Sequence, residues 1–462
     1  MNEELHWLTI TQTVSLIETK KISASEFFDH IARRIESFNP QLNAFVATDL
    51  DHTRDHAKRI DDLIKQGESV GSLMGALIGL KDICATEEFP TRMGSVALDP
   101  FLPGEDSEIA AKVREADGSI VGKLTTTEAA FMDHHESIRV PINPWDENSW
   151  TGVSSSGSGV ATAAGLCSAS FGTDTGGSIR FPALCCGLVG LKPTQNLLSV
   201  SGIFPLAPTM DHVGPMTRSV EDAALLLESV GREAGRENQN PPFSFRKDVG
   251  KPTDNLRVGF DEKYCTEGVD PQITRCIRTM VDHLRDEGIT IVELPMPSSE
   301  VAVANFPVIV SSEAALVHSK TPEGRFKDYS PGLRDALLAG KSFSALDYVK
   351  ANSARREFSA KLDESFDQID VFIAPSWGRT TPTLAEYEQS TDSELAALIR
   401  FTAPQNLAGL PALCLPGGLD RKGVPFGFQL FGPQWGDAEV LRIGALCERF
   451  TGFLDKHPVL VA

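Results

Sequence analysis

One stretch before the middle of the chain limits most strictly what the chain can fold into. Residues 151–194 read TGVSSSGSGVATAAGLCSASFGTDTGGSIRFPALCCGLVGLKPT, so glycines and small hydroxyl residues crowd into two loops around an alanine-rich run. Glycine has no Cβ, and backbone of this composition can approach a ligand or another segment closely. The alanine-rich run itself predicts a tightly packed helix over about residues 156–166. We expect the stretch to contribute the loops of a binding or catalytic site.

Three side chains in and before this stretch could cleave an amide. Ser154 and Ser178 lie within it, and Lys81 directly follows an apolar, strand-like run. A serine hydroxyl is a poor nucleophile unless a positioned base takes its proton. A lysine that is buried at a strand end has a lowered pKa and can act as that base. The alternative is a structural lysine, paired with Asp82 or Asp174.

The loop GTDTGGS, residues 172–178, places two glycines directly before a serine. Successive backbone N–H groups in such a loop can converge on one point, as an oxyanion at an attacked carbonyl requires. A plain turn or an anion-binding nest is the alternative reading of the loop alone. The sequence contains no GxSxG elbow, no Walker A motif and no GxGxxG motif, so the other common patterns do not compete.

Beyond the motif, apolar runs alternate with amphipathic segments. Ser23 opens a capping box, which predicts a helix to about Phe38, where an Asn-Pro pair follows. Residues 73–85 read as a buried strand, and residues 256–293 as a strand, a helix and a second strand. This alternation predicts an α/β fold.

Domain organisation follows from one polar segment. Residues 232–254 contain proline and glycine without any periodicity, and they predict a surface linker. We expect a single domain over residues 1–462, with the motif core at about 70–230 and a C-terminal half at 255–462. Aromatic residues of that half are candidates for pocket walls or for ordinary core: Phe306, Phe326, Tyr329, Trp377 and Phe401.

Charge and cysteine usage restrict the functional class. Lys and Arg number 43 against 63 Asp and Glu, a net charge of −20, which argues against nucleic acid as a partner. We expect no membrane span and no secretory leader, and therefore a cytoplasmic protein. The eight cysteines lack CxxC spacing and predict free buried thiols, with neither disulfides nor a metal site.

The motifs taken together resemble the amidase signature family. Its central pattern is GGSSxGS, an alanine-rich helix, G(S/T)DTGGSIRxPA and GxxGxKPT, and this chain has GVSSSGS, GTDTGGSIRFPA and GLVGLKPT. The likeness extends to GKLTTTE, DHVGPMTRSVEDAALLL, VFIAPS, FTAPQNLAGLPALCLPGG and GVPFGFQLFG, and so covers about residues 5–450. It implies a large, mostly parallel or mixed central sheet, covered by helices on both faces.

The resemblance also assigns residues to roles. It implies that Ser178 is the nucleophile, that Ser154 follows a cis peptide bond and relays protons, and that Lys81 is the base. The remaining positions carried over are the oxyanion-hole amides of Thr175, Gly176 and Gly177 and the supporting residues Ser155, Asp174 and Arg180. Val153 stands where the family usually has glycine, and Ala129 where many members have phenylalanine. No metal and no cofactor are implied.

The implied activity is hydrolysis of a linear carboxylic amide through an acyl-enzyme, and esters and carbamates are also within the range of the family. The substrate is a small molecule, and a homodimer is left open. A second reading is the glutaminase subunit of a tRNA-dependent amidotransferase, whose members typically have GSIRQPA, whereas this chain has Phe181. A third is a catalytically inactive binding protein on the same fold.

Overall fold

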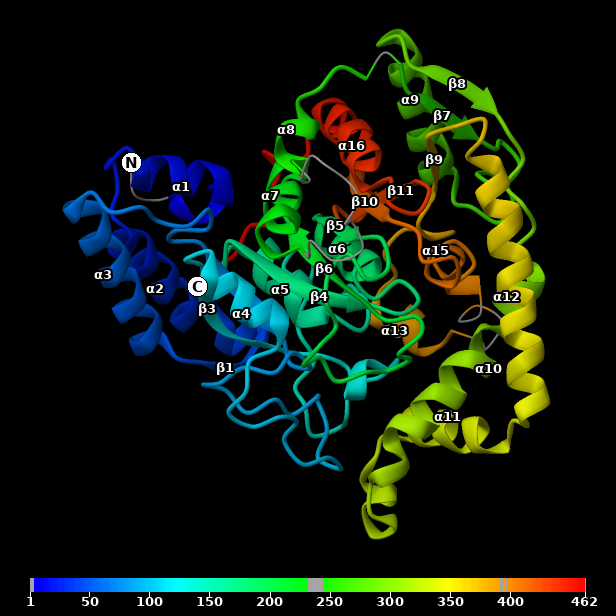
Figure 1. Ribbon diagram of the computed structural model, residues 1–462, viewed down its shortest axis with the longest axis horizontal. Coiled ribbons are helices and arrows are strands. Elements are labelled where there is room, and N and C mark those ends of the chain that lie inside the picture. Colours follow the sequence, from blue (N-terminus) through cyan, green and yellow to red (C-terminus); the bar gives the residue numbers. More distant parts are fainter. Residues whose placement is uncertain (1–3, 232–243, 254, 391–393, 395–396, 462) are drawn as a thin grey trace.

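The central feature of the protein, seen in a computed structural model, is one mixed β-sheet (Figure 1). The structure describes residues 4–231, 244–253, 255–390, 394 and 397–461. Within these residues the sheet has eleven strands. Their bounds are β1 Phe45–Thr48, β2 Leu77–Lys81, β3 Ser119–Leu124, β4 Ala169–Asp174, β5 Val189–Lys192, β6 His212–Thr217, β7 Arg257–Phe260, β8 Thr290–Glu293, β9 Val371–Pro375, β10 Ala412–Leu419 and β11 Pro425–Phe431.

Helices surround the sheet, with α1–α3 at one end of the view in Figure 1 and α10–α12 at the other. Their bounds are α1 Ile10–Glu18, α2 Ala24–Leu42, α3 Leu50–Gln66, α4 Glu108–Glu115, α5 Ser156–Ala163, α6 Arg180–Cys186, α7 Val220–Val230, α8 Phe245–Val249, α9 Pro271–Asp286, α10 Glu300–Val317, α11 Pro331–Ser342, α12 Ala345–Ser365, α13 Leu384–Glu388, α15 Ala403–Leu407 and α16 Asp437–Thr451.

The sheet contains two parallel groups of three strands, β3-β2-β4 and β9-β7-β8, and its other neighbouring strands, including the edge pair β1 and β3, are antiparallel. The strand order is β1-β3-β2-β4-β6-β5-β10-β11-β9-β7-β8, so strands from both halves of the chain share it. β2 runs parallel to both β3 and β4, and β7 runs parallel to both β8 and β9. Helix α9 connects β7 to β8, which confirms the predicted strand–helix–strand unit. The α/β class is confirmed, and the sheet is mixed.

The core lies on both faces of the sheet. Consecutive strand residues point to opposite faces, and Ile120 and Val121 of β3 accordingly belong to separate hydrophobic clusters. One cluster joins the sheet to α4, α7, α9 and α16, and the other joins it to α2, α3, α5 and α6. The cysteines contribute to this core, because all eight are free and all but Cys276 are buried, as predicted.

Helix α2 extends beyond the predicted end near Phe38. It continues through Pro40 to Leu42, and Asn43 caps it in the left-handed conformation with φ 52°. Proline removes one N–H donor and crowds one earlier carbonyl, but the residues after it can complete the last turn. The amide of Asn43 does so by donating to the carbonyl of Asn39 at 2.9 Å.

The predicted surface linker is only partly described. Residues 232–243 and 254 lie outside the described residues. Phe245–Val249 form the short helix α8, and Phe245 is buried against α7 and α16. Phe245, with Val249 also packed on the core, docks this part of the segment.

Helix α10 is the most apolar helix of this length in the described chain. By length and composition the segment Glu300–Lys320, with a mean hydropathy of 1.4, would suffice to cross a membrane, although the sequence predicts no such span. Half of the segment is buried inside the protein. It packs against α11, α12 and α15, and its Glu313 accepts hydrogen bonds from Thr209. These contacts are those of a core helix.

The contact between α10 and α11 depends on Gly340. A Cβ at this position would overlap the backbone carbonyl of Ser311, which cannot move without shifting α10. We expect Gly340→Ala to lower the free energy of unfolding by about 1–3 kcal/mol, measured by urea denaturation. Gly324→Ala is the matched control, because nothing lies within 4 Å of a Cβ there. Equal stability of the two variants would contradict the close packing.

Candidate active site

Lys81 and Ser154 meet at the carboxyl end of β2. The parallel strands β2 and β4 end at the same edge of the sheet, and this brings Lys81 beside Thr173. The Lys81 Nζ donates to the Ser154 Oγ at 2.6 Å and to the Thr173 Oγ1 at 2.8 Å. All three residues are buried. Thr173 was not predicted, although it lies inside the quoted motif.

Burial sets the protonation of Lys81. Loss of solvent lowers the pKa of Lys81 to about 7, and the nearby charges of Asp174 and Asp211 offset only part of this effect. In the described chain Lys81 forms no ion pair, and Asp82 lies instead 3.7 Å from the Nζ of Lys123. The alternative of a structural lysine paired with Asp82 or Asp174 therefore does not describe this site.

The backbone of Ser154 has an unusual geometry that the resemblance implied. The peptide bond between Val153 and Ser154 is cis, although Val153 replaces the glycine usual in the family. The carbonyl of Ser154 accepts hydrogen bonds from the Thr126 Oγ1 at 3.1 Å and from the Thr127 amide at 3.3 Å. The loop after β3 thereby holds this serine.

Ser178 lies in the adjacent loop and is partly exposed. Its carbonyl accepts a hydrogen bond from the amide of Ser155 at 3.4 Å, which joins the two serine loops. The Ser155 Oγ accepts from the amide of Thr173 at 3.2 Å. Among the described residues, the hydroxyl of Ser178 makes no hydrogen bond, and none links it to Ser154. Such bonds are often long in free enzymes and shorten when substrate binds.

The amides of the predicted oxyanion loop differ from one another. Gly177 has φ 129°, a conformation open mainly to glycine, and its amide donates to the Asp174 Oδ1 at 2.7 Å. In the described part of the chain the amides of Thr175, Gly176 and Ser178 donate no hydrogen bond. The Gly177 amide is therefore already engaged, whereas the other three have no hydrogen-bond partner among the described residues.

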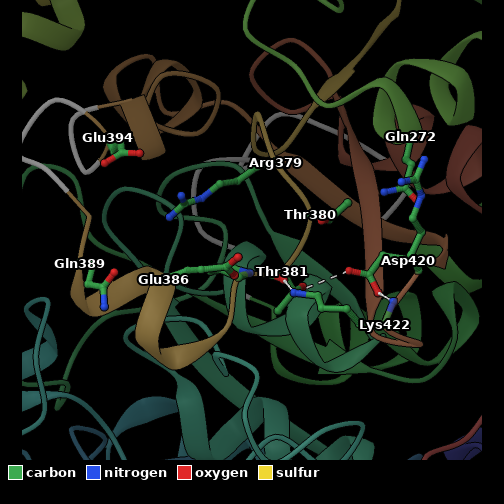
Figure 2. Close-up of a pocket in the computed structure, with 11 residues that line it drawn as sticks. Gln272, Arg379, Thr380, Thr381, Glu386, Gln389, Glu394, Asp420 and Lys422 are labelled. Atoms are coloured by element: carbon green, nitrogen blue, oxygen red, sulfur yellow. Dashed lines mark hydrogen bonds and ion pairs between the residues drawn. The ribbon is translucent and has the colours of Figure 1, made fainter.

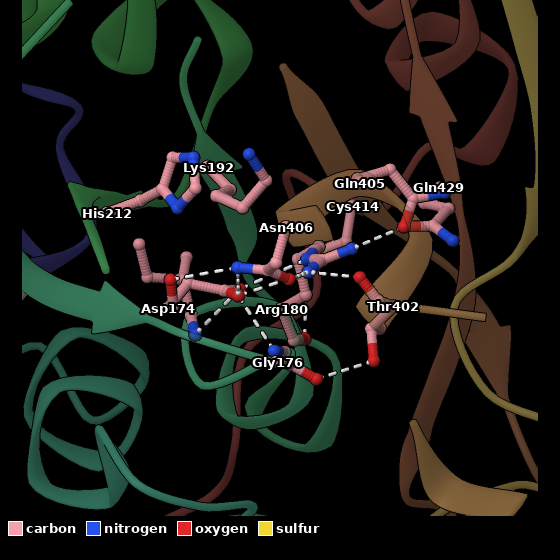
Figure 3. Close-up of polar contacts among 12 residues, drawn as sticks. Asp174, Gly176, Arg180, Lys192, His212, Thr402, Gln405, Asn406, Cys414 and Gln429 are labelled. Carbon is pink, nitrogen blue, oxygen red and sulfur yellow. Dashed lines mark hydrogen bonds and ion pairs between the residues drawn. The ribbon is translucent and has the colours of Figure 1, made fainter. Parts of the chain in front are cut away.

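Asp174 and Arg180 form a fully buried ion pair beneath this loop (Figure 3). The Arg180 Nε and Nη2 donate to the two carboxylate oxygens, each at 3.0 Å. Burial alone would raise the pKa of Asp174, but the charge and hydrogen bonds of Arg180 hold it well below its usual range. The remaining guanidinium bonds go to Gln405, Gln429, Asn406 and the carbonyl of Thr402.

These four partners of Arg180 were not predicted. They lie in the motifs FTAPQNLAGLPALCLPGG and GVPFGFQLFG, which carried the resemblance without any assigned role. The available signal was a polar side chain inside an apolar segment, such as Gln429 within β11. A buried polar group requires a hydrogen-bond partner, but the sequence does not say which partner it has.

Two pockets differ in character. One, of about 230 Å³, is lined mainly by apolar residues and includes Thr173 and Thr175 of the motif loop. The other, of about 540 Å³, is lined by charges of both signs from the C-terminal half, among them Arg379, Glu386 and Asp420 (Figure 2). None of the predicted site residues lines the second pocket. The first pocket is therefore the one that adjoins the candidate site.

The aromatic residues suggested as pocket walls divide into two groups. Two of them lie close to the candidate site. The ring of Phe306 packs against Gly176, so that a Cβ added to this glycine would lie 2.7 Å from the Phe306 Cζ. Trp377 packs in a cluster with Val153 and Phe181. The others lie elsewhere: Tyr329 bonds to His318, Phe401 packs on Tyr264, and Phe326 packs on Tyr329. None of the five lines either pocket.

The class that fold and site define is an α/β protein with a buried lysine–serine pair beside a glycine-containing loop. Comparison with known proteins agrees, because a family model described as Amidase matches residues 26–441. The protein named "Putative amidase AmiD" of Mycobacterium tuberculosis (strain ATCC 25618 / H37Rv) is 37% identical over 458 residues, 98% of this chain and 96% of that protein.

Two further proteins are similar over almost the whole chain. One subunit of the glutamyl-tRNA(Gln) amidotransferase of Chloroflexus aurantiacus (strain ATCC 29366 / DSM 635 / J-10-fl) is 31% identical over 489 residues, 99% of both chains. A solved structure described as "Crystal structure of amidase" has a TM-score of 0.86 and 28% identity, covering 96% of this chain and 100% of that chain. The chain belongs to the amidase family, and it is an amide-hydrolysing enzyme.

The buried ion pair between Asp174 and Arg180 should contribute most to the stability of the loop of residues 172–178, the motif loop. Asp174→Asn leaves the Arg180 charge uncompensated in the core, so we expect the free energy of unfolding to fall by about 3–5 kcal/mol in urea denaturation. The control is Asp62→Asn, which breaks the exposed pair with Lys65 and should cost less than about 1 kcal/mol. Equal costs would show that the buried pair does not hold the loop.

Proposed function

We propose that the protein cleaves the C–N bond of a small carboxylic amide with Ser178 as nucleophile, Ser154 as proton relay and Lys81 as base. The observation that carries this proposal is the 2.6 Å distance between the buried Lys81 Nζ and the Ser154 Oγ. The loop that contains Ser154 is in turn hydrogen-bonded to the loop that contains Ser178. A lysine whose pKa burial lowers to about 7 is partly neutral near neutral pH and can accept a proton.

In the proposed acylation step, neutral Lys81 takes the proton of Ser154 while Ser154 takes that of Ser178. The Ser178 oxygen forms a bond to the carbonyl carbon, and the carbonyl π electrons move to its oxygen. When the oxyanion collapses, the C–N bond breaks, and the proton returns from Lys81 through Ser154 to the departing amine. Water then repeats the sequence on the acyl-enzyme and releases the carboxylic acid.

The oxyanion requires donors that are unoccupied before substrate arrives. Thr175, Gly176 and Gly177 were the predicted donors, but the Gly177 amide already donates to Asp174. We therefore assign the oxyanion to the amides of Thr175, Gly176 and Ser178, and we give Gly177 the role of holding the turn. Such donors lie in a partly dehydrated loop, where each contributes about 10²–10³ in rate.

Ser155, Asp174 and Arg180 are supporting residues in this proposal. Ser155 holds the Thr173 backbone beside Lys81, and the ion pair holds the oxyanion loop. The proposal also places the enzyme in the cytoplasm, with no nucleic-acid or membrane partner. The net charge of −20 supports the absence of a nucleic-acid partner. A homodimer is also compatible with the proposal, and light scattering would test it by measuring the molar mass in solution.

The nucleophile assignment makes a direct prediction. Ser178→Ala should lower kcat for acetamide hydrolysis by more than about 10⁵-fold and abolish any acyl-enzyme mass shift. Ser37→Ala, on the exposed face of α2, is the matched control and should retain full activity. Residual activity of Ser178→Ala above trace levels would exclude Ser178 as the nucleophile.

The role of Lys81 predicts a pH dependence. Because its pKa is about 7 and the neutral form is the base, kcat/KM should rise about tenfold per pH unit below pH 7 and level off above it. Lys81→Met should lose at least about 10²–10⁴ in kcat/KM and remain folded, since it also removes an ammonium from the core. A rate that does not change between about pH 6 and 8 would argue against Lys81 as base.

The glutaminase reading is tested with the same enzyme. Ammonia release from glutamine that requires a copurifying partner protein would support that reading and displace the stand-alone amidase. The third reading, an inactive binding protein, would require that none of the amides is hydrolysed and that Ser178 does not react with a fluorophosphonate.

A further inference from the structure

The pocket of about 230 Å³ opens at the proposed reaction centre. Thr173, which lines it, accepts a hydrogen bond from Lys81, and Thr175, which also lines it, precedes the two loop glycines. Lys81, Ser154 and Ser178 do not themselves line the pocket, and it adjoins the proposed reaction centre through these two threonines. The other lining residues are Ile83, Ala130, Val200, Ile203, Phe204, Pro205, Leu206, Pro208 and Asp211.

The one charged side chain among these lining residues already has its partners. The carboxylate of Asp211 accepts hydrogen bonds from the Thr175 Oγ1 at 2.6 Å, the Leu206 amide at 2.8 Å and the Ala207 amide at 3.1 Å. No arginine or lysine is among the lining residues. The pocket therefore has no group to pair with a substrate carboxylate, which would lose its hydration there without compensation.

The walls of the pocket are held in place before any substrate binds. The amide of Phe204 donates to the carbonyl of Ile83 at 2.8 Å, which ties the loop after β5 to the end of β2. At the far end of that loop, Thr209 donates to Glu313 of α10 through its amide at 2.9 Å and its hydroxyl at 2.6 Å. A preformed apolar pocket selects its ligand by shape.

The size of the pocket further limits which substrate groups fit into it. A dry apolar cavity of about 150 Å³ is sufficient to bind benzene, so about 230 Å³ holds a phenyl ring or a branched alkyl group but no long acyl chain. We propose that this pocket receives a compact, uncharged apolar group joined directly to the scissile amide, and that free amino-acid amides such as glutamine are excluded. This inference rests on the proposed function.

The test compares four amides and one rim substitution. Wild-type kcat/KM would be measured for acetamide, benzamide, acetanilide and glutamine, since the first aryl amide carries its ring on the carbonyl and the second on the nitrogen. Val200, 37% exposed at the rim, would be changed to phenylalanine to fill the pocket from outside. Val140→Phe is the matched control, because Val140 is 39% exposed and does not line the pocket.

We expect one of the two aryl amides to exceed acetamide by at least about tenfold in kcat/KM, and glutamine to be the poorest substrate. Val200→Phe should lower that aryl preference at least about tenfold, while it changes acetamide less than about threefold. Val140→Phe should change neither rate. The melting temperature of each variant would show that it is folded.

Two results would overturn the inference while leaving the proposed function intact. These are a preference of the wild type for glutamine or acetamide over both aryl amides, and an equal loss for aryl amide and acetamide in Val200→Phe. In both cases acetamide hydrolysis that depends on Ser178 shows that the catalytic proposal holds. If no amide is hydrolysed and a fluorophosphonate does not label Ser178, the proposed function fails and this inference fails with it.

Discussion

The buried ion pair between Asp174 and Arg180 is the interaction on which the site depends. The carboxylate that neutralises Arg180 also accepts the amides of Gly177 and Ile179, so one group balances a buried charge and shapes the turn before α6. The guanidinium in turn reaches Gln405, 225 residues away in the chain. A charge in the core requires such complete pairing, and the C-terminal half therefore supplies the partners that complete this buried site.

Three lysines are fully buried, and they differ in the groups to which they donate hydrogen bonds. Lys123 lies near Asp82 and donates to the Thr91 hydroxyl, and Lys192 donates to the carbonyls of Pro193 and Leu410. Lys81 donates to two hydroxyl groups, one of which belongs to Ser154. A hydroxyl can give up a proton, whereas a carbonyl cannot, so under the proposed function Lys81 has a partner for proton transfer that Lys192 lacks.

The same connections relate the reaction centre to the pocket beside it. Thr175 bonds to Asp211, and the loop that ends at Asp211 is joined to α10 through Thr209. Helix α10 also carries Phe306, whose ring lies against Gly176 in the loop of residues 172–178. The positions of these loop residues and of the pocket walls are thus set together. Under the proposed function, selectivity for the substrate and placement of the catalytic groups would have a common structural basis.

The sequence alone determined the α/β class, the positions of several helices and strands, the free cysteines and the family, because periodicity, capping boxes and a long motif are local properties. It also named Lys81, Ser154 and Ser178 as candidates. Only the tertiary structure decided that Lys81 donates hydrogen bonds to hydroxyl groups and does not pair with Asp82. It also decided that the Gly177 amide donates to Asp174, and which distant side chains accept hydrogen bonds from Arg180. These are contacts between segments far apart in the chain, and their energies depend on burial, which no single segment encodes.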